Sequence, residues 1–105
     1  MADLTRTVAD FVADLAYGDL PQEVVDRTKL LIFDIPGVMI RARHDAESTP
    51  SLISAVERLG LASGDCSVPG DPRAYAPSAA ALINGTLAHS LDFDDTHAAG
   101  SLHSS

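Results

Sequence analysis

Hydrophobic residues recur at spacings of three and four positions along most of the chain, as they do on one face of an amphipathic helix. In the first such segment Leu4, Val8 and Phe11 share a face, and acidic residues lie on the other. Proline opens three of the segments and glycine follows two, at helix positions where each residue is favoured. The pattern predicts four helices, over residues 4–17, from Pro21 to at least Asp34, over residues 49–59 and over residues 76–91.

Two stretches interrupt this helical pattern. Residues 35–40 are apolar all round, which indicates burial in a helical assembly, but Pro36 and Gly37 stand among them. A proline inside a helix costs about 3 kcal/mol, so we expect a kink or a break there. Residues 61–75 carry several Gly and Pro turn signals and are typical of a connector, in which only Cys66-Ser67-Val68 favours a short extended piece.

These elements predict an all-α fold, an incomplete bundle of four main helices with one short irregular or extended connector. The last helix is rich in alanine, and small side chains let helix backbones approach closely, so we expect it in the middle of the bundle. His89, inside this helix, is expected to be buried with its hydrogen bonds satisfied. The length of 105 residues suits one domain or part of a larger one, and we expect a single partial domain over residues 1–105 without an internal boundary.

Charge and composition narrow the classes of function. Fifteen acidic residues against seven basic ones give a formal net charge of −8, which argues against nucleic acid and anionic membrane surfaces as partners. The sequence has no apolar run of about 18 residues and no basic leader followed by an apolar segment, so we expect a cytoplasmic protein outside the membrane. The single cysteine, Cys66, excludes an internal disulfide and a multi-cysteine zinc site.

Side chains that can act as acids, bases or metal ligands are most concentrated near the end of the chain. The segment Ser90–His97 and the later His103 place two histidines and three aspartates within twelve residues. Carboxylates crowded after the C-terminal end of a helix are disfavoured unless a proton, a cation or backbone N–H groups compensate them. A functional site is one explanation, and a solvated acidic loop with a helix cap is the other. The chain ends two residues after His103, and because a catalytic loop normally leads into the element that holds it, we expect the front part of a longer protein.

The string from Asn84 to His97, with His103 six residues later, resembles the signature of the MmgE/PrpD family, whose members include 2-methylcitrate dehydratase, cis-aconitate decarboxylase and iminodisuccinate epimerase. The earlier segments of the chain also occur in an order similar to that at the start of a family member. They are an N-terminal helix, Asp19-Leu20-Pro21, a leucine-rich stretch ending in Asp34 and Gly37, and an Ala-Ala-Leu-Ile-Asn-Gly helix. The likeness covers nearly all of this chain and the front portion of a family member. Pro36 and Ser104 depart from the usual family pattern.

The resemblance implies the N-terminal helical domain of a lyase or isomerase that moves a proton next to a carboxylate of a small di- or tricarboxylate, without an obligatory metal or cofactor. It implies that His103 is the general acid/base, a role that suits histidine's usual pKa of about 6.5. Asp92 would face the pocket or orient the histidine. Thr96 and Asp95 are the implied substrate-binding residues, Thr96 as a hydrogen-bond donor to a substrate carboxylate and Asp95 as a brace of the loop. The resemblance further implies a homodimer built through the helical domain.

Two other classes of function stay open. One is a divalent-metal module, because the terminal acids and histidines offer carboxylate and imidazole ligands. These residues are Asp92, Asp94, Asp95, His97 and His103. The other is a helical interaction piece without catalysis, whose partner would be a missing C-terminal portion or a second copy. Recognition of several carboxylates normally needs arginine, lysine or ordered backbone donors, and the one lysine is Lys29, so we expect the isolated chain to be inactive.

Overall fold

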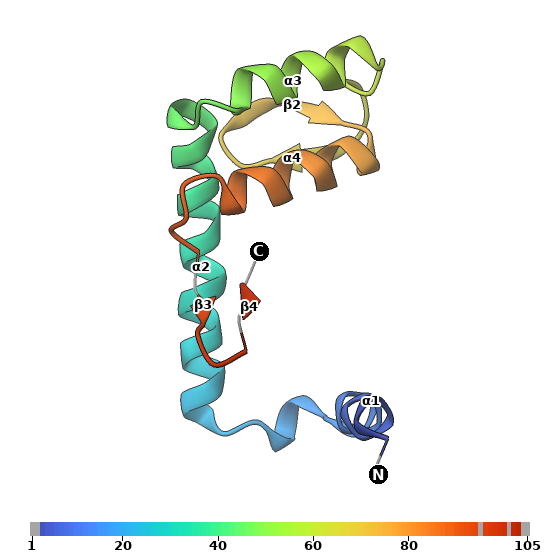
Figure 1. Ribbon diagram of the computed structural model, residues 1–105, viewed down its shortest axis with the longest axis vertical. Coiled ribbons are helices and arrows are strands. Elements are labelled where there is room, and N and C mark those ends of the chain that lie inside the picture. The colour runs from blue at the N-terminus through green and yellow to red at the C-terminus, as the bar shows by residue number, and fades with distance from the viewer. Residues whose placement is uncertain (1–2, 95, 101, 104–105) are drawn as a thin grey trace. The chain divides into compact units, whose positions relative to one another are not determined.

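The computed structural model describes residues 3–94, 96–100 and 102–103, with His97, Leu102 and His103 described by their backbone only. The chain divides into two compact units, residues 1–30 and 31–105, and one long helix begins in the first unit and ends in the second (Figure 1). The expectation of a single partial domain over residues 1–105 stays a prediction.

The first unit consists of two short helices and the start of a third. Helix α1 spans Leu4–Asp14, and the Asp3 carboxylate caps it by accepting a hydrogen bond from the Arg6 N–H at 3.2 Å. The 3₁₀ helix η1 spans Tyr17–Asp19 and contains Gly18. The first predicted helix is therefore confirmed, although it ends several residues before the glycine.

Helix α2 spans Gln22–Asp45 without interruption and contains Pro36. A break at Pro36, one of the two outcomes considered from the sequence, is therefore wrong. Proline has no N–H, so the carbonyl of Ile32 loses its usual partner. Ile32, Pro36 and Gly37 are all exposed, which leaves that carbonyl open to water and lowers the cost of the proline. The prediction that this helix reaches at least Asp34 is confirmed.

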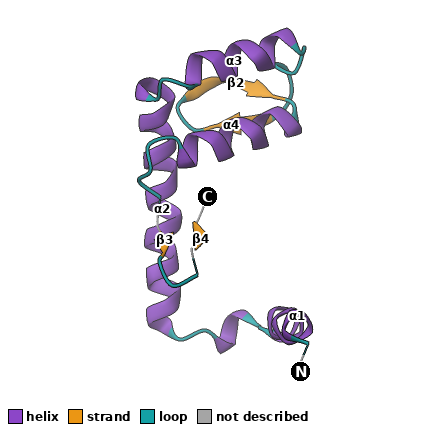
Figure 2. Ribbon diagram, viewed as in Figure 1, coloured by secondary structure: helices purple, strands orange, loops and turns teal. Residues whose placement is uncertain are grey.

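The connector folds into a β-hairpin. Strand β1 spans Cys66–Val68 and strand β2 spans Asp71–Tyr75, and the two pair antiparallel with one irregularity in their register. Pro69 and Gly70 form the turn, and Gly70 has a φ of +80°, which glycine adopts without strain. The extended piece at Cys66–Val68 is confirmed, whereas the sequence analysis did not predict the second strand (Figure 2).

The core of the second unit is built around α4, which spans Pro77–His89 and packs against both strands of the hairpin and against α3, at Thr49–Arg58 (Figure 1). The exposed face of α4 carries Leu82. In the described part of the chain this helix is therefore buried on one side only, not on all sides as expected for a central helix. The largest fully buried side chains are Tyr75, Ile83, Leu87, Val56 and Thr49.

The described residues are mainly helical, which confirms the predicted fold class. The connector contributes Val68 and Tyr75 to the core, so it is part of the fold and not only a link between helices. A second, two-residue strand pair consists of β3 at Thr96–His97 and β4 at Leu102–His103. None of the described helices combines the length and the apolar character needed to cross a membrane.

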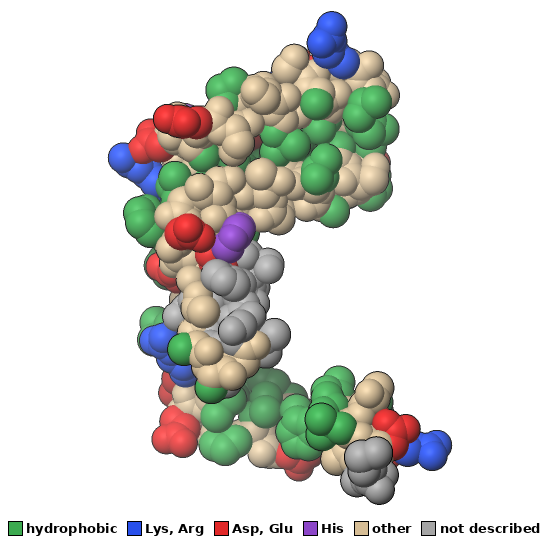
Figure 3. All heavy atoms as spheres, viewed as in Figure 1, with side chains coloured by type: hydrophobic (Ala, Val, Ile, Leu, Met, Phe, Trp, Pro, Cys, Tyr) green, Lys and Arg blue, Asp and Glu red, His purple; other side chains and the backbone are tan. Residues whose placement is uncertain are grey.

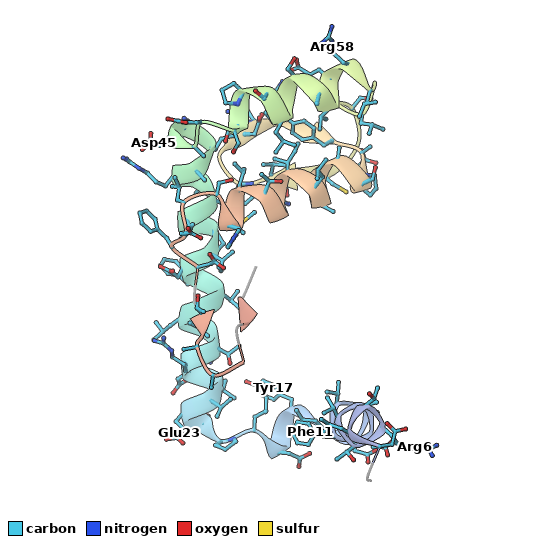
Figure 4. The ribbon with its side chains drawn as sticks, in the orientation of Figure 1. Arg6, Phe11, Tyr17, Glu23, Asp45 and Arg58 are labelled. Atoms are coloured by element: carbon cyan, nitrogen blue, oxygen red, sulfur yellow. The ribbon has the colours of Figure 1, made fainter. Side chains whose placement is uncertain are left out.

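Hydrophobic side chains remain at the surface of both units (Figure 3). In the first unit α1 buries none of its residues, and Phe11, labelled in Figure 4, is exposed. In the second unit Phe33 of α2 and Leu82 of α4 are exposed. The described residues thus leave several apolar helix faces uncovered.

Candidate functional site

The turn after α4 carries the acidic motif. Helix α4 ends at His89, and the N–H of Asp92 donates a hydrogen bond to the His89 carbonyl at 3.0 Å, which closes a tight turn. Asp92 has a φ of +54°, in the left-handed region, where aspartate is one of the few side chains that are tolerated. The helix end and the turn together fix where the motif's side chains start.

The acidic side chains of this turn differ sharply in exposure. The side chain of Asp92 is 84% exposed, and that of Asp94 is completely buried. A buried carboxylate is costly unless hydrogen bonds compensate it. The Asp94 Oδ1 lies 3.1 Å from Nδ1 of His89, so this imidazole is one of the groups that compensate it.

His89 lies between two carboxylates. Its Nδ1 contacts Asp94, and its Nε2 lies 3.7 Å from Oδ1 of Asp92. The side chain is 52% exposed, so the expectation of a buried histidine is wrong. The sequence did hold a signal for this arrangement, because His89 precedes Asp92 by three residues and Asp94 by five, at the end of a helix.

The same three side chains could hold a metal ion. The possible ligand atoms of His89, Asp92 and Asp94 all lie within 4.8 Å of one another. One imidazole and two carboxylates suit Mn²⁺, Fe²⁺ or Zn²⁺. The direct His89–Asp94 hydrogen bond also accounts for their proximity without a metal.

The remaining motif residues lie in the β3–β4 pair. The backbone of Thr96 is paired with that of His103, and the backbone of His97 with that of Leu102. The structure therefore brings two predicted site residues, Thr96 and His103, to opposite positions in a short ladder. The side chain of His103 and the whole of Asp95 lie outside the described residues, so their predicted roles stay predictions.

A hollow on the surface adjoins His89. It runs along the exposed face of α4 and is mostly apolar, so it offers van der Waals contact and few hydrogen bonds. Its lining residues are Ala81, Leu82, Gly85, Thr86, His89 and Ser90. The imidazole thus lies where this apolar surface meets the acidic turn.

A second polar cluster is centred on Asp71 in the hairpin. Its buried carboxylate accepts hydrogen bonds from Arg73 at 2.8 Å, from Tyr75 at 2.8 Å and from Arg43 at 2.9 Å. The Arg73 side chain is the largest influence that holds the Asp71 pKa well below its usual range, and it outweighs burial, which raises that pKa. Since protein donors surround the carboxylate, we assign this cluster to the stability of the hairpin.

Comparison with known proteins places this motif in a family. The model of the MmgE/PrpD N-terminal domain matches residues 6–105. The chain is 33% identical to the cis-aconitate decarboxylase-like protein oryM of Aspergillus oryzae over 104 residues, which are 97% of this chain and 21% of that protein. It is 30% identical to the cis-aconitate decarboxylase of Aspergillus terreus over 103 residues, 96% of this chain and 20% of that protein. It is also 30% identical to the human cis-aconitate decarboxylase over 98 residues, 91% of this chain and 20% of that protein.

The matches cover almost the whole of this chain and about a fifth of each relative. No solved structure matches the chain significantly. The family match includes the acidic turn and the β3–β4 pair, so the resemblance inferred from the motif is confirmed. The chain belongs to the MmgE/PrpD family, and its residues 6–105 match the model of that family's N-terminal domain.

Proposed function

We propose that this chain supplies acid/base and substrate-binding groups to an enzyme that transfers a proton next to a carboxylate of a small polycarboxylate. The observation that carries the proposal is the family match across the segment that holds Asp92, Thr96 and His103. In this proposal His103 is the general acid/base and Asp92 orients it or faces the substrate. Thr96 donates a hydrogen bond to a substrate carboxylate, and Asp95 braces the loop.

The geometry of the described residues supports these roles. The Asp92 side chain is mostly exposed, so a substrate can reach it, and the Thr96 backbone pairs with that of His103. Removing or delivering a proton near neutral pH requires a group that can exist in both protonation states, which histidine provides. We take decarboxylation of cis-aconitate as the reaction to test first, because the relatives named above are decarboxylases or decarboxylase-like. Dehydration of 2-methylcitrate is the second reaction to test.

The isolated chain is proposed to have no turnover. A substrate with several carboxylates needs cationic or backbone donors, whereas this chain has a net charge of −8 and one lysine. Two of its arginines, Arg43 and Arg73, pair with Asp71. The cations would come from the part of the relatives that this chain does not match, or from a partner chain. A homodimer through the helical domain and a cytoplasmic location belong to the same proposal.

A chimeric enzyme tests the proposed function. The matched segment of the Aspergillus terreus cis-aconitate decarboxylase is replaced by this chain, and release of carbon dioxide from cis-aconitate is measured. We expect turnover in the chimera and none with the chain alone. Asp92→Asn and His103→Asn should each lower kcat/KM by about 100-fold or more, as loss of acid/base groups does.

The control variant is Asp45→Asn at the end of α2, whose carboxylate pairs with Arg41 on the same helix. It should leave turnover unchanged. Circular dichroism and size-exclusion chromatography establish that each chimera is folded. A folded, active chimera that keeps its rate in both Asp92→Asn and His103→Asn would contradict the proposal, and turnover by the chain alone would contradict its proposed inactivity.

A second candidate function is binding of a divalent metal, which the closeness of His89, Asp92 and Asp94 favours. Calorimetric titration of the chain with Mn²⁺ or Zn²⁺ tests it. Stoichiometric binding that is lost in Asp92→Asn and kept in Asp45→Asn would support a metal site. Heats equal to those of dilution would exclude one.

A further inference from the structure

We infer that His89 and Asp94 are positioning residues of the candidate site. The buried Asp94 carboxylate fixes the His89 imidazole, and His89 in turn fixes the turn that carries Asp92. The inference rests on the proposed function, because a positioning role requires a site to position. It extends that function to two residues that the sequence analysis did not assign to catalysis or substrate binding.

The burial of Asp94 requires a partner for its carboxylate. Its side chain is fully buried, in a turn whose neighbouring acid, Asp92, is mostly exposed. Taking a carboxylate out of water costs several kcal/mol unless its lone pairs are used. Burial in so short a turn therefore points to a specific binding partner, and the His89 imidazole at 3.1 Å is such a partner.

The contact with Asp94 also determines the state of the His89 imidazole. When Asp94 is ionised its carboxylate can only accept hydrogen bonds, and its bond with His89 then requires that Nδ1 carry the hydrogen. In a neutral ring Nε2 then has no hydrogen and acts as an acceptor. This nitrogen lies on the side of Asp92, 3.7 Å from its Oδ1. Asp94 thus selects both the orientation and the tautomer of the ring.

His89 connects its ring to the turn that carries Asp92. His89 is the last residue of α4, next to the buried Leu87 and Ala88, so its backbone is held by the core. Its carbonyl accepts the Asp92 N–H at 3.0 Å, and its ring contacts Asp94 beyond that residue. His89 therefore holds the turn at two points, at the backbone of Asp92 and at the side chain of Asp94. Such a clamp explains how Asp92 is held at a φ of +54° while its side chain reaches solvent.

The tautomer of His89 in the folded chain is the direct test. Long-range ¹H–¹⁵N correlation spectra are recorded on the 105-residue chain at a pH where histidine side chains are neutral. We expect His89 to be mainly the Nδ1–H tautomer, with a pyridine-like shift for Nε2. In Asp94→Ala this preference should be lost. A predominant Nε2–H tautomer in the unmodified chain would overturn the inference, without recourse to any variant.

Two substitutions of His89 separate positioning from mere packing. The amide of His89→Asn places its NH₂ where Nδ1 was and can still donate to Asp94, whereas that of His89→Gln places its NH₂ near the former Nε2. We expect the amide shifts of Asp92 and Phe93 to stay close to those of the unmodified chain in His89→Asn and to move in His89→Gln. Equal shifts in both variants would contradict the inference. These spectra are recorded on the chain alone and without substrate, so they do not depend on turnover in the chimera. Failure of the proposed function can therefore be distinguished from failure of this inference.

Discussion

At the scale of single residues, Asp71 determines how the hairpin is attached to α2. Its carboxylate is fully buried and accepts hydrogen bonds from Arg73 and Tyr75 of its own strand and from Arg43 of α2. Hydrogen bonds to charged groups are stronger than neutral ones, and a buried charge without them is costly. Asp71 therefore links β2 to α2 through one side chain.

Replacing Asp71 by asparagine should destabilise the chain. The amide has one acceptor oxygen and turns an NH₂ group toward cationic partners, so we expect the free energy of unfolding to fall by about 2–4 kcal/mol. Urea denaturation followed by circular dichroism measures the change. Asp45→Asn is the matched control, because its carboxylate is partly exposed and pairs with Arg41 within one helix, a contact worth about 0.5 kcal/mol or less. Equal losses in the two variants would contradict this role of Asp71.

Acid should weaken the fold through the same carboxylate. Because its pKa is lowered in the folded chain from a usual value of 3.8, Asp71 stabilises the fold fully above that value. The contribution is lost progressively as the pH falls below it, since the unfolded chain then binds the proton first. We expect the difference in unfolding free energy between the unmodified chain and Asp71→Asn to shrink between pH 5 and pH 2. A difference that stays constant across that range would show that the charge of Asp71 is not responsible.

Two glycines should respond in opposite directions to alanine. A Cβ on Gly64 would lie 2.3 Å from the carbonyl oxygen of Tyr75, so the backbone must move, and we expect a loss of about 1–3 kcal/mol. A Cβ on Gly85 of α4 would meet nothing within 4 Å, and alanine is the better helix former there, so we expect a gain of up to about 1 kcal/mol. Melting temperatures of the two variants, compared with the unmodified chain, test the pair. A loss at Gly85 or no change at Gly64 would contradict the predicted packing.

The candidate site could be predicted only in part at this scale. The resemblance of the motif to the family signature pointed to Asp92 and Thr96, and the structure places both in the segment after α4. The role of His89 was missed because it depends on the direction of the chain after the helix. That direction is set by the left-handed Asp92, a conformation that the residue type permits but does not require. The spacing of three and five residues permits the contacts of His89 with Asp92 and Asp94, but it does not determine them, because they depend on this one backbone conformation.

At the scale of elements, α2 shows how a helix accommodates an unfavourable residue. Pro36 removes one hydrogen bond, yet the helix continues to Asp45. In the described residues, Val38 and Met39 of the following turn are buried, so tertiary packing holds that part of the helix in place. The sequence shows the residue that disfavours the helix, but it does not show the burial of Val38 and Met39, which holds the helix together after it.

Pro36→Ala should therefore stabilise the chain by about 1–3 kcal/mol, because the alanine restores the hydrogen bond to the Ile32 carbonyl and removes the ring. Pro50 is the matched control, since it lies in the first turn of α3, where a missing N–H has no helical partner to lose. Pro50→Ala should change the unfolding free energy by less than about 0.5 kcal/mol. Urea denaturation curves of both variants provide the comparison. If Pro36→Ala had no effect or a destabilising one, the proline would be contributing contacts of its own.

The hairpin marks the limit of pattern-based prediction for these elements. The helices follow from periodic apolar positions, which report burial of one face directly. Strand β2 has no such alternation, and it contains Asp71 and Pro72, two residues that disfavour strands. Its conformation depends on pairing with β1 and on the hydrogen bond that Arg43 of α2 donates to Asp71, which is a tertiary contact. The Pro69-Gly70 turn was the available signal, since this pair fits the two central positions of a type II turn.

At the scale of the whole molecule, buried side chains are unevenly distributed among the described elements. Helix α1 has eleven residues and buries none of them, whereas α4 contributes Ile83 and Leu87 to the core of the second unit. Isolated helices shorter than about 12–15 residues are marginal in water. The exposed apolar face of α1 is consistent with the interaction-piece alternative, in which another protein segment covers it.

Hydrogen exchange should reveal this difference in the isolated chain. We expect the amides of α1 to exchange at close to unprotected rates, because α1 opens without exposing buried surface, whereas those of Ile83 and Leu87 should exchange only on opening of the second unit. Ala9→Gly in α1 should leave the melting temperature unchanged, and Ala80→Gly in the buried face of α4 should lower it, although both replace alanine by glycine within a helix. Strong protection of α1 in dilute monomeric samples, or a lowered melting temperature in Ala9→Gly, would mean that α1 is already packed. In that case its apolar face would not be available to a second protein segment, and the interaction-piece alternative would lose its support.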